Sequence, residues 1–180
     1  MTSLASLVVT ASVLLGQAPA SNYEHLKEYG EANVGEWVSE MDVDFDYPPI
    51  VKKGDKATIK VVNKWILNKN AISSQWTVEV NGITVGSGQG IVGWDRSAER
   101  IVEYGFGSLG GRTEGIVEKR GDKWYGSGIG VAPDGKVGAG MSIVTILDDD
   151  THEILEIGRI SPQGEPLPNQ KITAKRVQTN

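Results

Sequence analysis

The sequence has no cysteine, no apolar run long enough to span a bilayer as a helix, and no concentration of positive charge. Without cysteine the chain forms no disulfide, no thiolate metal site and no thiol nucleophile. The 18 Lys and Arg residues are scattered and are outnumbered by 23 Asp and Glu, which gives a formal charge of −5. Because no basic stripe neutralises phosphates, we expect no nucleic-acid partner. An acidic surface also repels anionic headgroups, so we expect no membrane partner once the first residues are removed.

Residues 1–20 have the pattern of an export signal. Leu4 to Leu15 form an apolar run of signal length. Ala18-Pro19-Ala20 then supplies the small residues that a signal peptidase accepts. No Lys or Arg precedes Lys27, so the usual positive start is missing, and a cytoplasmic protein that keeps residues 1–20 is the alternative. We expect an exported chain, periplasmic or extracellular, with a single mature domain over residues 21–180.

The stretch from Gln75 to Phe106 predicts antiparallel strands. Trp76, Val78 and Val80 alternate with polar residues, which is the period of a strand with one buried face. Asn81-Gly82 tolerates positive φ at both positions and predicts a type I′ hairpin. Alternating runs separated by turn signals continue to the last residues. The only helix that we expect lies at about 22–30, and the lack of a helical crossover pattern after residue 34 argues against a parallel sheet.

These elements predict an all-β fold, an antiparallel up-and-down β-barrel of about 8–10 strands over residues 35–178. A closed barrel removes the exposed sheet edges that a sandwich of this size would have to protect. The 23 glycines support closure, because several fall at alternate strand positions, as at Gly86, Gly88 and Gly90. Such spacing permits the close backbone approach and sharp coiling that barrels need.

The two ends of the predicted barrel resemble the lipocalin-like (calycin) families. Gly35-Glu36-Trp37 is similar to the G-x-W motif that opens their first strand, and those families place an Arg of the final strand against that Trp. The resemblance implies that Trp37 and Arg176 close the barrel base as structural residues. A guanidinium over an indole contributes about 0.5–2 kcal/mol, depending on burial.

A closer resemblance covers about Leu26 to Val177. It is to an uncharacterised family of bacterial lipocalin-like domains that are often found after SnoaL-like domains. The similar strings are Gly35-Glu36-Trp37-Val38, Lys64-Trp65, Gly90-Ile91-Val92-Gly93-Trp94-Asp95 and Gly164-Glu165-Pro166-Leu167. The resemblance implies a lipocalin-like barrel and provides no catalytic residues.

No metal or cofactor is expected. The acidic stretch 42–46 has the opening spacing of a calcium loop, but Tyr47 and Lys53 stand where such a loop needs Gly and Glu. Two histidines are too few for a zinc site. Nitrobindins, also lipocalin-like barrels, hold haem through one axial His. His152 would have to fill that role here, and its place beside a turn indicates exposure.

The barrel interior is the remaining candidate site. Polar residues interrupt the apolar rows that we assign to the inner face: Ser39, Asn63, Ser74, Ser87, Gln89 and Tyr104. A few polar groups in an apolar cavity are typical of a small-molecule pocket, while a packed core with those groups bonded to one another is the alternative. We expect the pocket or its rim to be formed by Trp65, Trp76, Gln89, Trp94 and Tyr104.

The predicted function is binding of a small apolar or amphipathic ligand without catalysis. One alternative is an enzyme of the isomerase or cyclase type that works in the barrel cavity, with Tyr104 or Glu103 as its polar group. A buried titratable group with a shifted pKa would favour that alternative. The other is a structural or interaction module with a filled barrel, which an exposed apolar patch would favour.

Overall fold

The computed structural model describes residues 23–46, 48–161 and 163–178. The predicted export signal lies outside these residues. Within them the chain forms one α-helix, one short 3₁₀ turn and ten strands. The elements are α1 (Tyr23–Asn33), β1 (Gly35–Asp42), β2 (Lys56–Ile66), η1 (Leu67–Lys69), β3 (Ala71–Val80), β4 (Ile83–Asp95), β5 (Arg100–Gly107), β6 (Arg112–Arg120), β7 (Lys123–Val131), β8 (Val137–Asp148), β9 (Thr151–Ile160) and β10 (Gln170–Arg176).

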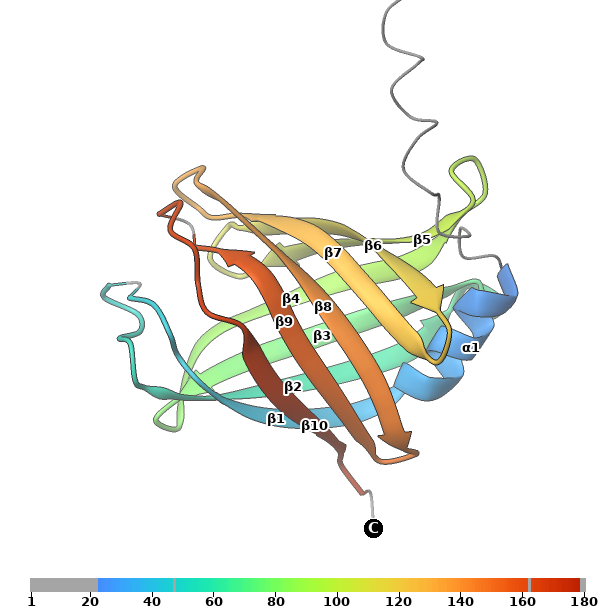
Figure 1. The fold of residues 1–180 in the computed structure, drawn as a ribbon, viewed down its shortest axis with the longest axis horizontal. Coiled ribbons are helices and arrows are strands. Elements are labelled where there is room, and N and C mark those ends of the chain that lie inside the picture. Colours follow the sequence, from blue (N-terminus) through green and yellow to red (C-terminus); the bar gives the residue numbers. More distant parts are fainter. Residues whose placement is uncertain (1–22, 47, 162, 179–180) are drawn as a thin grey trace, which may run out of the picture.

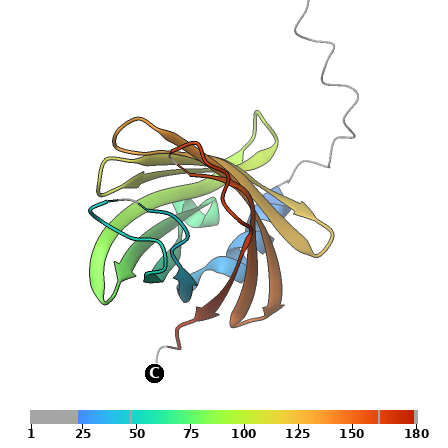
Figure 2. The ribbon, with the colours of Figure 1, turned by 60° about the vertical axis from the view of Figure 1, so that its left-hand side comes forward.

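The strands form a closed antiparallel barrel in which each strand pairs with its neighbours in sequence (Figures 1 and 2). Strand β1 pairs with β2 on one side and with β10 on the other, so the first and last strands close the sheet. The closing register places Trp37 opposite Arg176. The predicted all-β up-and-down barrel is therefore confirmed. The predicted hairpin at Asn81 and Gly82 is also present, with φ of 51° and 78°.

Helix α1 lies across one end of the barrel (Figure 1). Its Leu26 is fully buried in the main core, where Tyr23 and Tyr29 pack beside it. The other buried members of this core come from five strands: Ile72, Val92, Ile101, Val117 and Trp124. The apolar side of the helix therefore fills this end of the barrel with side chains.

The helix is longer than the predicted range, because it continues past Gly30 to Asn33. Gly30 is buried inside the helix, and a Cβ there would lie 2.1 Å from the Trp65 ring. The glycine thus provides the space that the indole occupies and does not end the helix. Such close approach is a second reason for a glycine, besides its freedom at turns.

Arg176 joins the last strand to the end of α1. Its Nη1 and Nη2 donate to the carbonyl oxygens of Val34 and Ala32, at 2.6 and 3.2 Å. The indole Nε1 of Trp37 donates to the carbonyl oxygen of Asn33 at 2.9 Å. Carbonyls at a helix C-terminus have no partner within the helix, and a cation there also interacts favourably with the negative end of the helix dipole. Trp37 and Arg176 therefore hold the helix against the base of the barrel.

The opposite end of the barrel carries residues 43–46 and 48–55, between β1 and β2, which fold across the opening (Figure 2). Val43 is buried there with Ala57 and Val80 in a second, smaller core. Asp44 forms an ion pair with Arg159 of β9 across the opening, and the two side chains are only 15% and 12% exposed. We call this end of the barrel the mouth.

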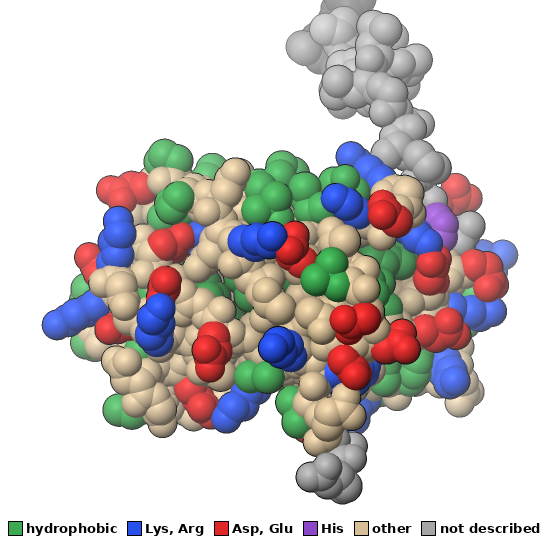
Figure 3. All heavy atoms as spheres, turned by 60° about the horizontal axis from the view of Figure 1, so that its bottom comes forward, with side chains coloured by type: hydrophobic (Ala, Val, Ile, Leu, Met, Phe, Trp, Pro, Cys, Tyr) green, Lys and Arg blue, Asp and Glu red, His purple; other side chains and the backbone are tan. Residues whose placement is uncertain are grey.

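The outer surface mixes charges of both signs. On the face shown in Figure 3, Lys and Arg are interspersed with Asp and Glu and form no continuous basic stripe. Within the described part of the chain, the single helix is neither long enough nor apolar enough to cross a membrane.

Candidate functional site

Glycines form much of the inner wall on five neighbouring strands, β4 to β8. The strand register places them on the inward face of the sheet, the same face as Trp76 of β3, Ile101 of β5 and Trp124 of β7. These glycines are Gly86, Gly88, Gly90, Gly105, Gly107, Gly115, Gly126, Gly128, Gly130, Gly138 and Gly140. An added Cβ would meet nothing within 4 Å at Gly86, where the wall borders open volume. A Cβ would come within 3.0 Å of neighbouring atoms at six other positions, where the wall permits close approach instead: Gly88, Gly90, Gly105, Gly115, Gly126 and Gly128.

The resulting space begins with an apolar pocket at the mouth of about 480 Å³. Phe45, Ile50 and Val51, between β1 and β2, line one side of it, and the glycine wall lines the other. Its apolar side chains include Phe45, Ile50, Val51, Trp76, Val78, Val85, Leu109 and Val131. A volume of this size lies in the range of small-molecule sites.

Two deeper pockets adjoin the mouth. One, of about 380 Å³, shares Phe45 and Thr113 with the mouth pocket. The other, of about 230 Å³, reaches Tyr29 of α1 and shares Trp76 with the mouth pocket. Glu103 of β5 lines both deeper pockets. The interior is thus apolar at the mouth and polar at mid-depth, with a carboxyl group where its deeper parts meet.

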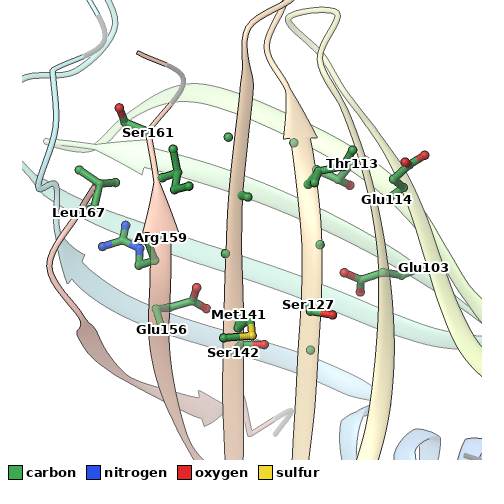
Figure 4. A pocket seen from close by; sticks show the side chains of 18 of the residues that line it. Glu103, Thr113, Glu114, Ser127, Met141, Ser142, Glu156, Arg159, Ser161 and Leu167 are labelled. Atoms are coloured by element: carbon green, nitrogen blue, oxygen red, sulfur yellow. The ribbon is translucent and has the colours of Figure 1, made fainter. Parts of the chain in front are cut away.

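Two glutamates face this mid-depth space from opposite sides. In Figure 4 the carboxyl groups of Glu103 on β5 and Glu156 on β9 point into the pocket, each toward the other's side. Ser142 on β8 lies opposite Glu156 in the register, and Thr113 on β6 lines the same pocket. No described side chain forms a hydrogen bond or an ion pair with either glutamate.

Burial shifts the pKa of both carboxyl groups upward. Loss of hydration is the main cause at Glu103, and the charge of Glu156 raises the pKa of Glu103 further. Loss of hydration also raises the pKa of Glu156, while the nearby Arg159 partly offsets the rise. Tyr29 lines the 230 Å³ pocket together with Glu103. Burial raises the pKa of Tyr29, and the charge of Glu103 raises it further. Each of these shifts favours the uncharged form of an acid.

Arg159 is the one cation among the described residues that line the 380 Å³ pocket. Its guanidinium turns away from the two glutamates in Figure 4. It pairs with Asp44, with Nη2 and Oδ1 3.2 Å apart, and its Nη1 donates to the carbonyl oxygen of Pro168 at 3.2 Å. Asp44 and Pro168 therefore hold the guanidinium of Arg159 at the mouth. Its charge only partly offsets the upward shift in the pKa of Glu156.

The aromatic residues predicted for the pocket divide into two groups. Trp76 lines both the mouth pocket and the pocket above α1. Trp65 and Trp94 are half-buried and pack against the core beneath the helix instead. They lie toward the closed end because the register places Trp65 opposite the core residue Ile72 and Trp94 opposite the core residue Ile101.

Gln89 and Tyr104, predicted to face the interior, lie on the outer wall. Gln89 is exposed, and Tyr104 is 57% exposed. The reason is strand alternation: Gly88 lies opposite Trp76 and must take the inner face, since a Cβ at Gly88 would come 2.1 Å from the Trp76 ring. Gln89 then points outward. Glu103, named only in the enzyme alternative, takes the inward place next to Tyr104.

Sequence reasoning did not single out Glu156, Arg159 or Phe45. The sequence does indicate that Glu156 faces inward, because strand alternation puts it on the same face of β9 as His152 and Ile154. Arg159 follows a register irregularity around Gly158, whose φ is 57°, so simple alternation misplaces it. Phe45 depends on the path of a loop, which has no periodic signal.

His152 is buried rather than exposed as predicted. It is 4% exposed and stacks on Trp37 with 4.1 Å between ring centres. Burial lowers the pKa of His152, and the nearby Arg176 lowers it further. His152 lines none of the pockets described above. Among the described residues, no group of three or more His, Asp and Glu side chains is arranged to hold a metal ion.

The closed ten-strand barrel is a calycin-like fold. No protein-family model matches the chain, and no curated protein does. The solved structure of Rv2717c from M. tuberculosis is similar, with a TM-score of 0.58, 14% identity, and coverage of 85% of this chain and 98% of that chain. The S-type phycobiliprotein lyase CPES from Guillardia theta has a TM-score of 0.46, 10% identity, and coverage of 86% of this chain and 94% of that chain. At these identities the likeness concerns the fold alone.

Proposed function

We propose that this protein binds a small apolar or amphipathic molecule inside the barrel. The observation that carries the proposal is the glycine wall of β4 to β8, which leaves an apolar pocket of about 480 Å³ at the mouth. Closed barrels of modest size either fill with side chains or enclose one small ligand. Here the helix fills one end, and the other end keeps its volume.

Gly86 provides a direct test, because it faces the mouth pocket and a Cβ built on it meets nothing within 4 Å. In Gly86→Leu a larger side chain would occupy the space that the ligand needs. A hydrophobic fluorophore titrated into the wild-type protein should quench tryptophan emission saturably through Trp76. We expect Gly86→Leu to weaken that binding about tenfold or more, as expected when a pocket is filled.

Gln89→Leu is the matched control, since position 89 is on the same strand but faces outward. It should bind the fluorophore as the wild-type protein does. Equal binding by the wild-type protein and Gly86→Leu would place the fluorophore outside the barrel and contradict the proposal.

The enzyme alternative has one observation in its favour, the placement of Glu103. It lies in the cavity, and loss of hydration raises its pKa, as expected for a general acid or base that works near neutral pH. Under the enzyme hypothesis, Glu103 would exchange a proton with a bound molecule. Turnover of a candidate substrate that is lost in Glu103→Gln, while binding remains, would support catalysis over simple binding.

Export and family membership are further proposals. The apolar run and the small residues at Ala18-Pro19-Ala20 support cleavage near Ser21, and Gly35-Glu36-Trp37 with Arg176 supports the resemblance to bacterial lipocalin-like domains. Expression of the full chain in a bacterial host, followed by N-terminal sequencing of the periplasmic protein, tests the proposed export and cleavage. An uncut chain in the cytoplasm would contradict it.

A further inference from the structure

The interior of the barrel is unbalanced in charge. Glu103 and Glu156 face the 380 Å³ pocket without a partner among the described side chains. The cation that lines this pocket, Arg159, is paired with Asp44, and the cation that lines the mouth pocket, Arg112, is paired with Glu114. A carboxylate that leaves water without gaining a partner is costly, and the cost is relieved by a proton or by a cation. The pocket therefore lacks one positive group at mid-depth.

The shape of the interior decides which cation fits. The mouth pocket is lined by Phe45, Val78 and Val85 and has almost no polar surface. A hydrated metal ion gains nothing from such a mouth, while an organic cation buries its apolar part there. The glutamates lie deeper, so the charged group of the ligand would enter first and the apolar part would follow.

We infer that the pocket selects an organic cation, a protonated amine with an apolar tail, whose nitrogen lies between Glu103 and Glu156. This inference rests on the proposed function, since it names the class of ligand for the same cavity. A carboxylic acid of the same length would bring a third negative charge to this place. An alcohol would form hydrogen bonds but would leave the carboxylates without a counter-charge.

Binding of an amine would be linked to proton release. The groups that face Glu103 and Glu156 are Tyr29 from α1 and Arg159 from β9, with Asp44 behind Arg159. Loss of hydration raises the pKa of both glutamates, and a bound ammonium group favours their charged forms. Affinity for the amine should therefore fall as the pH falls through the raised pKa values, and protons should leave as the amine binds.

The test compares three probes of equal chain length, octylammonium, octanol and octanoate, as competitors of a hydrophobic fluorophore at about pH 7. We expect octylammonium to displace the fluorophore at about tenfold lower concentration than octanol, which is the strength of a charge-assisted hydrogen bond, and octanoate to be the weakest. Octylammonium binding by the wild-type protein, measured from about pH 4 to pH 7 in two buffers of different ionisation enthalpy, should also show proton release where the pH lies below the raised pKa values.

The double variant Glu103→Gln/Glu156→Gln should bind octanol as the wild-type protein does and should lose the preference for octylammonium. Glu153→Gln is the control, because Glu153 lies on β9 but pairs with Lys171 outside the pocket. If octanol binds and octylammonium is no tighter, or if the double variant keeps the preference, the inference is wrong and the proposed function stands. If none of the three probes binds, the proposed function is wrong and the inference fails with it.

Discussion

The guanidinium of Arg176 lies over the indole of Trp37, 4.3 Å from the ring centre, and His152 stacks on the same indole. This contact joins the first and last strands at the place where the barrel closes. The same guanidinium donates to the carbonyls at the end of α1. One side chain thus stabilises both the closure of the sheet and the position of the helix.

Replacing Arg176 with Gln should lower the free energy of unfolding by about 2–4 kcal/mol. The change removes a cation–π contact of about 0.5–2 kcal/mol and leaves helix carbonyls without their charged donor. Urea unfolding followed by tryptophan emission measures the effect. Lys175→Gln, at the neighbouring exposed position, should change the free energy by less than about 0.5 kcal/mol. Equal effects of the two substitutions would show that the contact contributes nothing to stability.

Two glycines of β4 should respond oppositely to alanine. At Gly88 a Cβ would lie 2.1 Å from the Trp76 ring and 2.6 Å from the backbone oxygen of Phe106, whereas at Gly86 it would meet nothing within 4 Å. We expect Gly88→Ala to destabilise the protein by about 1–3 kcal/mol through overpacking. Gly86→Ala should be neutral or should stabilise it by up to about 1 kcal/mol, because alanine restricts the unfolded chain.

Thermal midpoints of these two variants, measured side by side, are sufficient for the comparison. Destabilisation by both to the same degree would indicate that β4 needs glycine for its backbone and not for the space near Trp76.

Glu103 should make the protein less stable as the pH rises. Its pKa in the folded state is raised, so its contribution to stability is complete below the ordinary Glu value of 4.5 and is lost as the pH rises through the raised value. Relative to the wild-type protein, Glu103→Gln should therefore be more stable at pH 8 than at pH 4. The difference between their unfolding free energies, measured across this range, isolates Glu103 from His152, which titrates in both proteins.

A difference between Glu103→Gln and the wild-type protein that stays constant across this range would mean that Glu103 is hydrated in the folded protein.

Arg159→Met should destabilise the protein by about 2–4 kcal/mol, because it leaves Asp44 without its partner in a place only 15% exposed. The double variant Asp44→Asn/Arg159→Met should regain part of that loss. Arg112→Met, which breaks a pair whose side chains are 50% and 45% exposed, should cost less than about 1 kcal/mol. Chemical unfolding of the four proteins measures these effects, and a double variant no more stable than Arg159→Met would show that the unpaired carboxylate of Asp44 does not destabilise the protein.

The sequence predicts the fold better than the site. Alternation at Trp76, Val78 and Val80 and the Asn81-Gly82 turn are local signals, so strands and hairpins follow from them directly. The site depends on which face of each strand is turned inward. The inward face of one strand depends on the strands beside it. For β4 and β5, Gly88 and Gly107 lie in register with Trp76, and at Gly88 only glycine leaves room for the indole ring on the inner face. The predicted inward positions of Gln89 and Tyr104 are wrong, because a polar residue in a strand has no feature of its own that indicates the inner face.

By itself the sequence determined that the described chain is built of antiparallel strands with one helix, since strand period, turn residues and charge are all local properties. It also contained the two residues, Trp37 and Arg176, that meet at the closure. Only the tertiary structure decided where volume remains, because the space beside an inward glycine depends on its neighbours: a Cβ would clash with the Trp76 ring at Gly88 and would meet nothing within 4 Å at Gly86. It likewise placed Glu103 and Glu156 across the same space, 53 positions apart in a chain whose closure alone brings β5 and β9 face to face.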